Sequence, residues 1–223
     1  MTVLLSAATP FEIQPTLNHL PTFPHLTVRS LITGPGIPAT IYALTRTLMG
    51  PERPDLLIHA GIGGAFDRQV ALGTVFQMTS DCFADLGVQE KDGGFSDLFQ
   101  LELLRPEQPP FGQDGRMHHP HQHDMRFLPL AHGITVNTVS GTQTRIDFLR
   151  KRYSADVESM EGAAVFYVCL LEEMPFLCLR SISNHVEPRQ RDRWDLPGAI
   201  HTLNQHVQLI LNSLSKISSD AIR

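Results

Sequence analysis

The chain has 223 residues, of which 42% are hydrophobic and 18% charged, as is typical of a folded protein with a sizeable core. Its formal net charge of −5 argues against a general nucleic-acid binder, which usually carries a basic stripe. No apolar run approaches the roughly 20 residues that cross a bilayer. We therefore expect a soluble protein that binds neither nucleic acid nor membrane.

The cysteines and the start of the chain bear on location. Cys82, Cys169 and Cys178 form no C-x-x-C pair and lie among apolar residues, so reduced core thiols are the simplest interpretation. Residues 1–8 lack a positively charged segment and soon become polar, which predicts a first buried strand and not a signal peptide. Both features favour a cytoplasmic protein.

Short apolar runs alternate with helix-like stretches along the chain. The predicted strands are residues 3–5, 27–32, 56–59, 73–78, 134–139 and 176–179. The predicted helices are residues 38–49, 163–173 and 196–214, the last with apolar residues at a spacing of three and four. This alternation indicates an α/β fold with a parallel or mixed sheet. No linker is evident, so residues 1–223 are expected to form one domain.

Residues 105–129 depart from this pattern, being rich in Pro, Gln and Gly and carrying His118, His119, His121 and His123. Imidazole is a common metal ligand, so a metal site is one interpretation. No carboxylate or cysteine spacing supports a closed site, and a polar tract with prolines is more often a surface loop. We therefore expect a loop and no bound metal.

Two further segments directly follow predicted strands. The run Gly-Ile-Gly-Gly at residues 61–64 would let a ligand approach the backbone, but it lacks the G-x-G-x-x-G pattern of dinucleotide sites. A plain turn explains this run equally well. Glu12 follows the first strand and is either a solvated surface residue or a catalytic one.

The most informative segments are Glu-Ser-Met-Glu-Gly-Ala-Ala, from residue 158, and Arg-Ser-Ile-Ser-Asn, from residue 180. Glu161 opens a predicted helix that is apolar almost all round, so its carboxylate is expected to be buried and to need a hydrogen-bond partner. The hydroxyls of a ribose are plausible donors. Asn184 is expected near the carboxyl end of a strand, where open α/β sheets bind ligands. The two side chains together indicate a polar small molecule.

These segments together resemble the purine nucleoside phosphorylase and nucleosidase superfamily, over nearly the whole chain. Residues 83–88 (Phe-Ala-Asp-Leu-Gly-Val) and 184–189 (Asn-His-Val-Glu-Pro-Arg) are similar to the futalosine hydrolase family within it. The resemblance implies a single α/β domain with a twisted mixed sheet flanked by helices, in a homo-oligomer, a dimer or larger. It implies hydrolysis of the N-glycosidic bond of futalosine to hypoxanthine and dehypoxanthine futalosine in menaquinone biosynthesis, without a cofactor.

The resemblance also implies roles for individual residues. Glu12 matches the carboxylate that activates water, Met160 and Glu161 match the residues beside the ribose, and Gly63 lies in a glycine loop next to the ligand. Asn184 stands where adenine-specific nucleosidases carry an aspartate. An asparagine carbonyl can accept from a protonated N7 while its amide donates to a 6-oxo oxygen, which favours hypoxanthine over adenine.

Two questions stay open at this point. Nucleosidases carry an aromatic residue soon after Val-Ser-Gly, where this chain has Thr-Gln-Thr followed by Arg145. Arg145 either binds a ligand carboxylate, such as the benzoate of futalosine, or is a solvated surface residue, and Phe148 or Tyr167 could stack on the base. The alternatives to the hydrolase are another purine nucleosidase, a non-catalytic nucleoside-binding protein, and a phosphorylase that would need Arg46 or Arg68 to bind phosphate.

Overall fold

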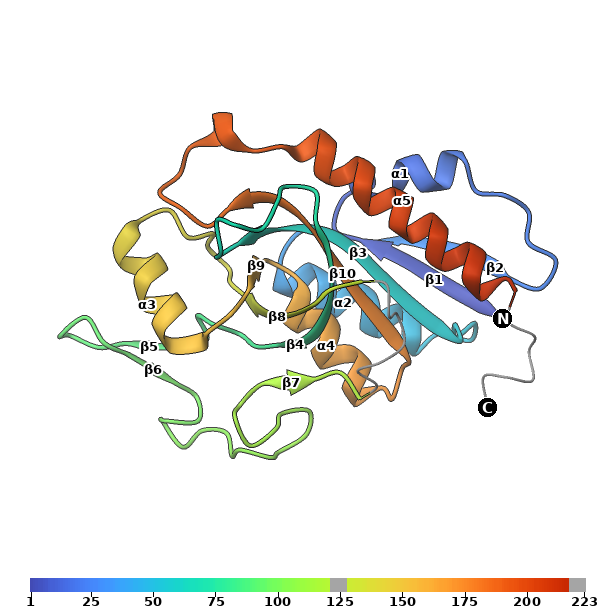
Figure 1. The fold of residues 1–223 in the computed structure, drawn as a ribbon. Helices are drawn as coiled ribbons and strands as arrows, with labels where there is room; N and C mark the ends of the chain where they lie inside the picture. Colours follow the sequence, from blue (N-terminus) through green and yellow to red (C-terminus); the bar gives the residue numbers. More distant parts are fainter. Residues whose placement is uncertain (121–127, 217–223) are drawn as a thin grey trace.

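The computed structural model describes residues 1–120 and 128–216, which are built around one mixed sheet of eight strands (Figure 1). Its strands are β1 (Thr2–Ala7), β2 (Thr27–Ile32), β3 (Leu56–Ala65), β4 (Val75–Asp81), β7 (Met117–His118), β8 (Leu130–Thr135), β9 (Val157–Ser159) and β10 (Phe176–His185). A separate hairpin consists of β5 (Gly87–Gln89) and β6 (Phe95–Asp97). Parallel and antiparallel pairs both occur, so the predicted mixed sheet is confirmed.

The long strand β3 is the centre of this sheet. β10 pairs with one edge of β3 from Leu57 to Ala65. The opposite edge is shared by two strands: β1 pairs with residues 56–59, and β9 pairs with residues 64–65. Residues 60–63 therefore have a strand partner on one side only. A chain of pairings through β10, β4, β8 and β9 returns to β3 and closes a ring.

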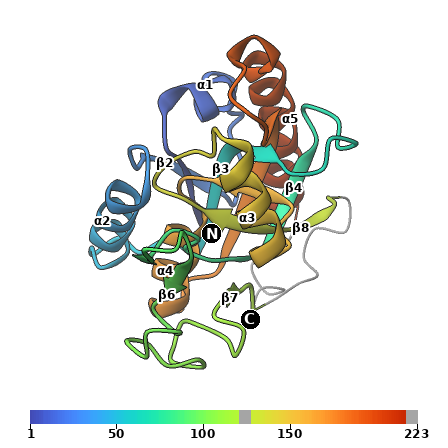
Figure 2. The same cartoon turned by 90° about the vertical axis from the view of Figure 1, so that its left-hand side faces the viewer.

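Five helices, α1 (Pro10–Asn18), α2 (Ile37–Leu48), α3 (Gln143–Tyr153), α4 (Gly162–Leu171) and α5 (Leu196–Leu214), surround the sheet in the described part of the chain. α5 packs beside α1 on one face, and α2 packs beside α4 on the other (Figures 1 and 2). The apolar stripe of α5 packs on β3, β4 and β10, which confirms the predicted spacing. Seven of the ten residues of α4 are buried, because this helix lies between the sheet and α2.

Some elements differ from those predicted. α1 and α3 were not predicted, because α1 is short and contains Pro15 while α3 is mostly polar, so neither has a strong apolar period. The predicted strand at residues 134–139 is wrong at both ends: β8 runs from Leu130 to Thr135. Hydrogen bonds from the backbone N–H and side-chain amide of Asn137 to Asp85 (2.8 and 3.1 Å) hold the segment that follows as a loop.

The histidine-rich segment is not simply a surface loop. β7 pairs with β4, and His119 is buried with its Nε2 at 2.6 Å from the carbonyl oxygen of Phe176. His118 contacts Asp114 at 3.0 Å, and His121 and His123 lie outside the described residues. Within residues 1–120 and 128–216, no group of three or more His, Cys, Asp or Glu is placed to hold a metal ion.

The three cysteines are buried and free, as predicted. Burial raises the pKa of the Cys178 thiol to about 11, and therefore keeps this thiol protonated at neutral pH. Among the helices that the structure describes, none combines the length and the apolar character that crossing a membrane requires.

Candidate active site

A pocket of about 350 Å³ lies beside the half-paired stretch of β3, in the size range of small-molecule sites. It brings together five of the six residues that the sequence singled out: Glu12, Gly63, Met160, Glu161 and Asn184. Segments far apart in the chain thus converge at one place. Arg145 is not among the lining residues.

The strand order explains this convergence. β1 runs parallel to β3 and ends opposite His59, whereas β9 runs antiparallel to β3 and leaves it near Gly64. The carboxyl ends of β1 and β9 therefore point toward the same gap, from opposite directions. Glu12 follows β1 and Glu161 follows β9, so the gap receives both carboxylates. Ligands of α/β sheets bind where strand connections diverge in this way.

Glu12 is buried, with 6% of its surface exposed, so the interpretation as a solvated residue is wrong. Its Oε2 accepts from the backbone N–H and the hydroxyl of Thr9 (2.8 and 3.0 Å), which forms a capping box at the start of α1. Its Oε1 accepts from the N–H of Ile62 at 3.2 Å, in the stretch that has no strand on that side. A carboxylate has about four acceptor sites, so one is left for a water molecule.

The glycine run is part of β3 and not a turn after it, so the expectation of a turn or loop is wrong. The reason for glycine is visible at Gly61. A Cβ atom there would lie 3.1 Å from Nη1 of Arg180 and 3.3 Å from Oε1 of Glu12. Both side chains therefore rest against the bare backbone of β3, which a larger residue would obstruct.

Arg180 is the main component that the sequence analysis did not select. It lies in β10 and is completely buried. Nη1 donates to the carbonyl oxygen of Leu179 at 2.9 Å, while Nε and Nη2 have no hydrogen-bond partner in the described structure. Charged residues are almost never fully buried unless they are paired. A lone arginine inside an apolar strand therefore indicates a buried charge, and this signal could have identified Arg180 from the sequence.

Glu161 precedes the first turn of α4 and is 8% exposed. Its Oε1 accepts from the N–H of Gly36 at 2.9 Å, which fixes the carboxylate against the loop before α2. Burial raises the pKa of Glu161, and the positive charge of Arg180 opposes that rise. The remaining acceptor sites face the pocket and suit hydroxyl donors of a ligand.

A chain of hydrogen bonds holds the first turn of α4 in place. The N–H of Gly162, the first residue of α4, donates to the hydroxyl of Ser159 at 3.2 Å. The N–H of Ala163 donates to the hydroxyl of Thr135 (2.7 Å), which donates to Oδ1 of Asp81 (2.9 Å). Burial raises the pKa of Asp81 to about 6. This buried acid thus supports the turn that carries Glu161.

Asp81→Asn tests this raised pKa. The folded protein keeps the proton of Asp81 up to about pH 6, whereas the usual pKa of an exposed aspartate is 3.8. The free energy of unfolding therefore falls as the pH rises through this window, and asparagine removes that loss. Relative to the parent protein, the variant should gain on the order of 3 kcal/mol between about pH 4 and pH 7, at about 1.4 kcal/mol per pKa unit. Denaturant unfolding measures this gain, and a difference independent of pH would contradict it.

Asn184 lies within β10 rather than after it, next to a β-bulge. In an unbroken register Ser183 would stand opposite Gly64, but the shift places Asn184 there instead. The bulge thus turns Asn184 to the face opposite to that of Arg180. Its Oδ1 accepts from the hydroxyl of Ser183 at 2.9 Å, and its Nδ2 donates to the carbonyl oxygen of His185 at 3.1 Å. One acceptor site and one hydrogen of the amide remain for a ligand.

The rest of the pocket wall is largely apolar. The wall includes Trp194, Leu196 and Ile200, from the start of α5 and the segment before it, together with Phe11. Trp194 is the single tryptophan of the chain and provides an aromatic surface that the sequence analysis did not identify. Phe148 packs on Phe95 and Tyr167 packs on Phe83 and Phe111, away from this pocket.

Arg145 lies in α3, behind the wall of the pocket. Its Nη2 is 3.3 Å from both Oδ2 of Asp85 and the carbonyl oxygen of Thr138. Asp85 also accepts two hydrogen bonds from Asn137. This network fixes the loop that ends at Ser140. The structure therefore gives Arg145 a bracing position. It lines a separate groove beside Asp85 and Phe148, outside the candidate site, and is not freely solvated.

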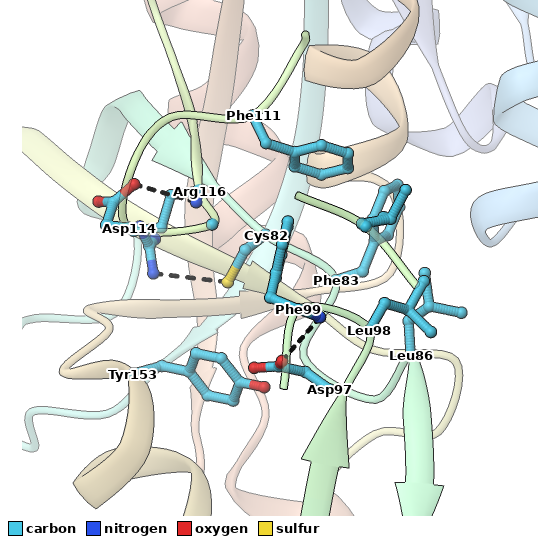
Figure 3. A pocket seen from close by; sticks show the side chains of 12 residues that line it. Cys82, Phe83, Leu86, Asp97, Leu98, Phe99, Phe111, Asp114, Arg116 and Tyr153 are labelled. Carbon is cyan, nitrogen blue, oxygen red and sulfur yellow. Dashed lines mark hydrogen bonds between the residues drawn. The ribbon is translucent and has the colours of Figure 1, made fainter. Parts of the chain in front are cut away.

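A second, smaller hollow of about 60 Å³ lies elsewhere and is walled by aromatic and aliphatic side chains (Figure 3). The charged residues that line it are already partnered. Arg116 contacts Ser80, Cys82 and the carbonyl oxygen of Gly133, Asp97 accepts from Arg152, and Asp114 contacts His118. This hollow shares no residue with the larger pocket. The pocket of about 350 Å³ is the candidate active site because it holds Glu12, Glu161 and Asn184 together.

The sequence profile of the phosphorylase superfamily matches residues 5–217. The chain belongs to the phosphorylase superfamily. This member is 32% identical over 160 residues to the futalosine hydrolase of Streptomyces coelicolor, covering 69% of the chain and 63% of that relative. It is 34% identical over 155 residues to the futalosine hydrolase of Acidothermus cellulolyticus, covering 66% of the chain and 61% of that relative. The matched region thus spans less than two thirds of either relative.

Solved structures of a nucleosidase and of a futalosine hydrolase share the fold over almost the full length. The 5'-methylthioadenosine/S-adenosylhomocysteine nucleosidase of Helicobacter pylori, solved with butyl-thio-DADMe-Immucillin-A, has a TM-score of 0.77 at 16% identity, covering 96% of this chain and 98% of its own. The native futalosine hydrolase of Helicobacter pylori has a TM-score of 0.72 at 14% identity, covering 94% and 97%. The predicted nucleoside phosphorylase-like fold is thereby confirmed.

Proposed function

We propose that this protein hydrolyses the N-glycosidic bond of futalosine, releasing hypoxanthine and leaving dehypoxanthine futalosine, as a step of menaquinone biosynthesis. The observation that carries the proposal is the single pocket shared by Glu12, Glu161 and Asn184. Glu12 is suited to bind water, Glu161 to accept hydrogen bonds from ribose hydroxyls, and Asn184 to bind a 6-oxopurine. The two relatives named futalosine hydrolase support this choice of substrate.

In the proposed reaction, the bond between C1′ and N9 breaks and its electron pair leaves with the base. Glu161 accepts hydrogen bonds from the ribose hydroxyls as positive charge develops on the sugar. Glu12 takes a proton from the water whose oxygen bonds to C1′, a general-base contribution of about 10²–10⁴-fold. The departing base takes a proton from solvent, and Asn184 accepts from N7–H while it donates to the 6-oxo oxygen. No metal or cofactor enters this scheme.

The charges near the pocket favour water over phosphate as the nucleophile. Among the residues that the structure describes, no Lys or Arg lines the pocket. Arg46 lines an outer groove together with Arg29, and Arg68 is an exposed residue paired with Glu187 at 3.0 Å. Arg180 is close but fully buried and lies against Gly61. Among the described residues, a phosphate ion would thus meet three glutamates and no accessible cation.

A base-release assay tests the proposal. Futalosine, inosine and methylthioadenosine are each incubated with the protein, with and without phosphate, and the free base is measured by chromatography. We expect release of hypoxanthine from futalosine, at a rate independent of phosphate and above that for the other two nucleosides. Release that requires phosphate would identify a phosphorylase, and preferential release of adenine would identify another nucleosidase. Absence of any release would indicate a non-catalytic binding protein.

We also propose a cytoplasmic homo-oligomer, a dimer or larger. Large apolar side chains lie exposed at the pocket, on α2 and directly after it, including Phe11 (76% exposed), Tyr42 (66%) and Met49 (73%). Burial of such side chains against a second copy would be favourable. Sedimentation velocity measures the assembly state directly.

A further inference from the structure

Three residues form a row across neighbouring strands on the floor of the pocket. Gly64 of β3 stands opposite Glu158 of β9 on one side and opposite Asn184 of β10 on the other. Residues that stand opposite each other in a sheet point to the same face. Glu158 and Asn184 therefore flank Gly64 on one face, and all three line the pocket.

The middle position of this row has no side chain. A Cβ atom on Gly64 would lie 2.9 Å from Nδ2 of Asn184 and 3.0 Å from Cγ2 of Val186, so any other residue would crowd the amide. The bare backbone leaves a slot between Glu158 and Asn184. A flat ring that lies over Gly64 would present one part of its edge to Asn184 and another part to Glu158.

Glu158 is equipped to accept hydrogen bonds from such a ring. It is 4% exposed, and its Oε1 accepts from the N–H of Ser140 at 3.0 Å while its Oε2 accepts from the Ser140 hydroxyl. These bonds use two of the roughly four acceptor sites of a carboxylate. No ion pair satisfies Glu158 within the described residues, since Arg145 pairs with Asp85. Buried carboxylates require hydrogen-bond donors, and the pocket side of Glu158 is where a ligand donor would fit.

We propose that Glu158 reads the N1–H group of a 6-oxopurine base while Asn184 reads its N7 and 6-oxo oxygen. This inference rests on the proposed function and specifies how the base is chosen. Around its edge hypoxanthine presents N7, then the 6-oxo oxygen, then the N1–H donor. Adenine carries an acceptor at N1, which would face the acceptor oxygens of Glu158. The two side chains thus select against adenine at separate positions of the ring.

Glu158→Gln tests this assignment with the product base as the probe. Glutamine has the same shape, and it can keep both contacts with Ser140 because the hydroxyl can accept from the new amide. Binding is followed by the fluorescence of Trp194, the single tryptophan, which lines the pocket. We expect Glu158→Gln to weaken hypoxanthine binding about 10–100-fold, the typical effect of losing a charge-assisted hydrogen bond. Binding of 1-methylhypoxanthine, which has no N1–H, should be weak and nearly equal in the two proteins.

A second variant and two outcomes complete the test. Ser140→Ala keeps the carboxylate but removes one of its supports, so it should weaken hypoxanthine binding less than Glu158→Gln does. The inference is overturned if Glu158→Gln binds hypoxanthine as tightly as the parent protein does. It is also overturned if the substitution weakens the binding of hypoxanthine and of 1-methylhypoxanthine equally. Should Glu158→Gln not fold, equal affinity of the parent protein for hypoxanthine and 1-methylhypoxanthine would overturn it. Failure of the parent protein to bind hypoxanthine at all would instead refute the proposed function.

Discussion

Glu12→Gln lowers kcat for hypoxanthine release from futalosine by about 10²–10⁴-fold, the typical contribution of a positioned general base. The physical reason is the loss of the carboxylate acceptor that takes the proton of water. Glutamine can still accept from Thr9 at the start of α1, because either Glu or Gln serves in a capping box. The affinity for hypoxanthine should change little, since the proposed reaction places Glu12 beside the water and C1′ and not beside the base. Initial-rate kinetics and Trp194 fluorescence measure the two quantities separately.

Thr9→Val is the matched control for this variant. It removes the hydroxyl that donates to Oε2 of Glu12 at 3.0 Å but keeps the carboxylate and the backbone N–H bond at 2.8 Å. A modest loss of stability with a much smaller loss of kcat is expected, since the base itself remains. Turnover of Glu12→Gln within tenfold of the parent protein would remove Glu12 from the role of general base.

Asn184→Asp shifts the base preference toward adenine by about 10–100-fold in the ratio of kcat/KM for inosine to that for adenosine. A carboxylate accepts from the 6-amino group of adenine but opposes the 6-oxo oxygen of hypoxanthine, and one mismatched buried hydrogen bond costs about 1–3 kcal/mol. The two nucleosides differ only in the base, so the ratio isolates base recognition. Parallel assays of both substrates measure the effect.

Ser183→Ala tests whether the base preference depends on the orientation of the Asn184 amide as well as on its presence. The Ser183 hydroxyl donates to Oδ1 of Asn184 at 2.9 Å and thereby sets which end of the amide faces the base. Its loss should reduce the preference for inosine less than Asn184→Asp does, and in the same direction. If Asn184→Asp leaves the ratio unchanged, the base is read by other groups.

Much of the fold could be predicted where apolar residues recur with a clear period. The bounds of β2 and α5 match the prediction. The first was predicted from a short apolar run, and the three-and-four spacing of the second directly reports which side of the helix is buried. α1 and α3 gave no such signal, since Pro15 interrupts the first and charged residues dominate the second. β9 is only three residues long, too short for any periodic pattern.

The sequence by itself determined the α/β class, the family and most of the residues that meet in the pocket, because these depend on local composition and on motifs along the chain. Only the tertiary structure decided how those residues act together. β1 and β9 share one edge of β3 and leave residues 60–63 half-paired. This gap explains why Glu12 is buried, why the glycines belong to a strand, and why Arg180 lies against them. Pairing between distant strands produces these features, and no spacing within one segment encodes it.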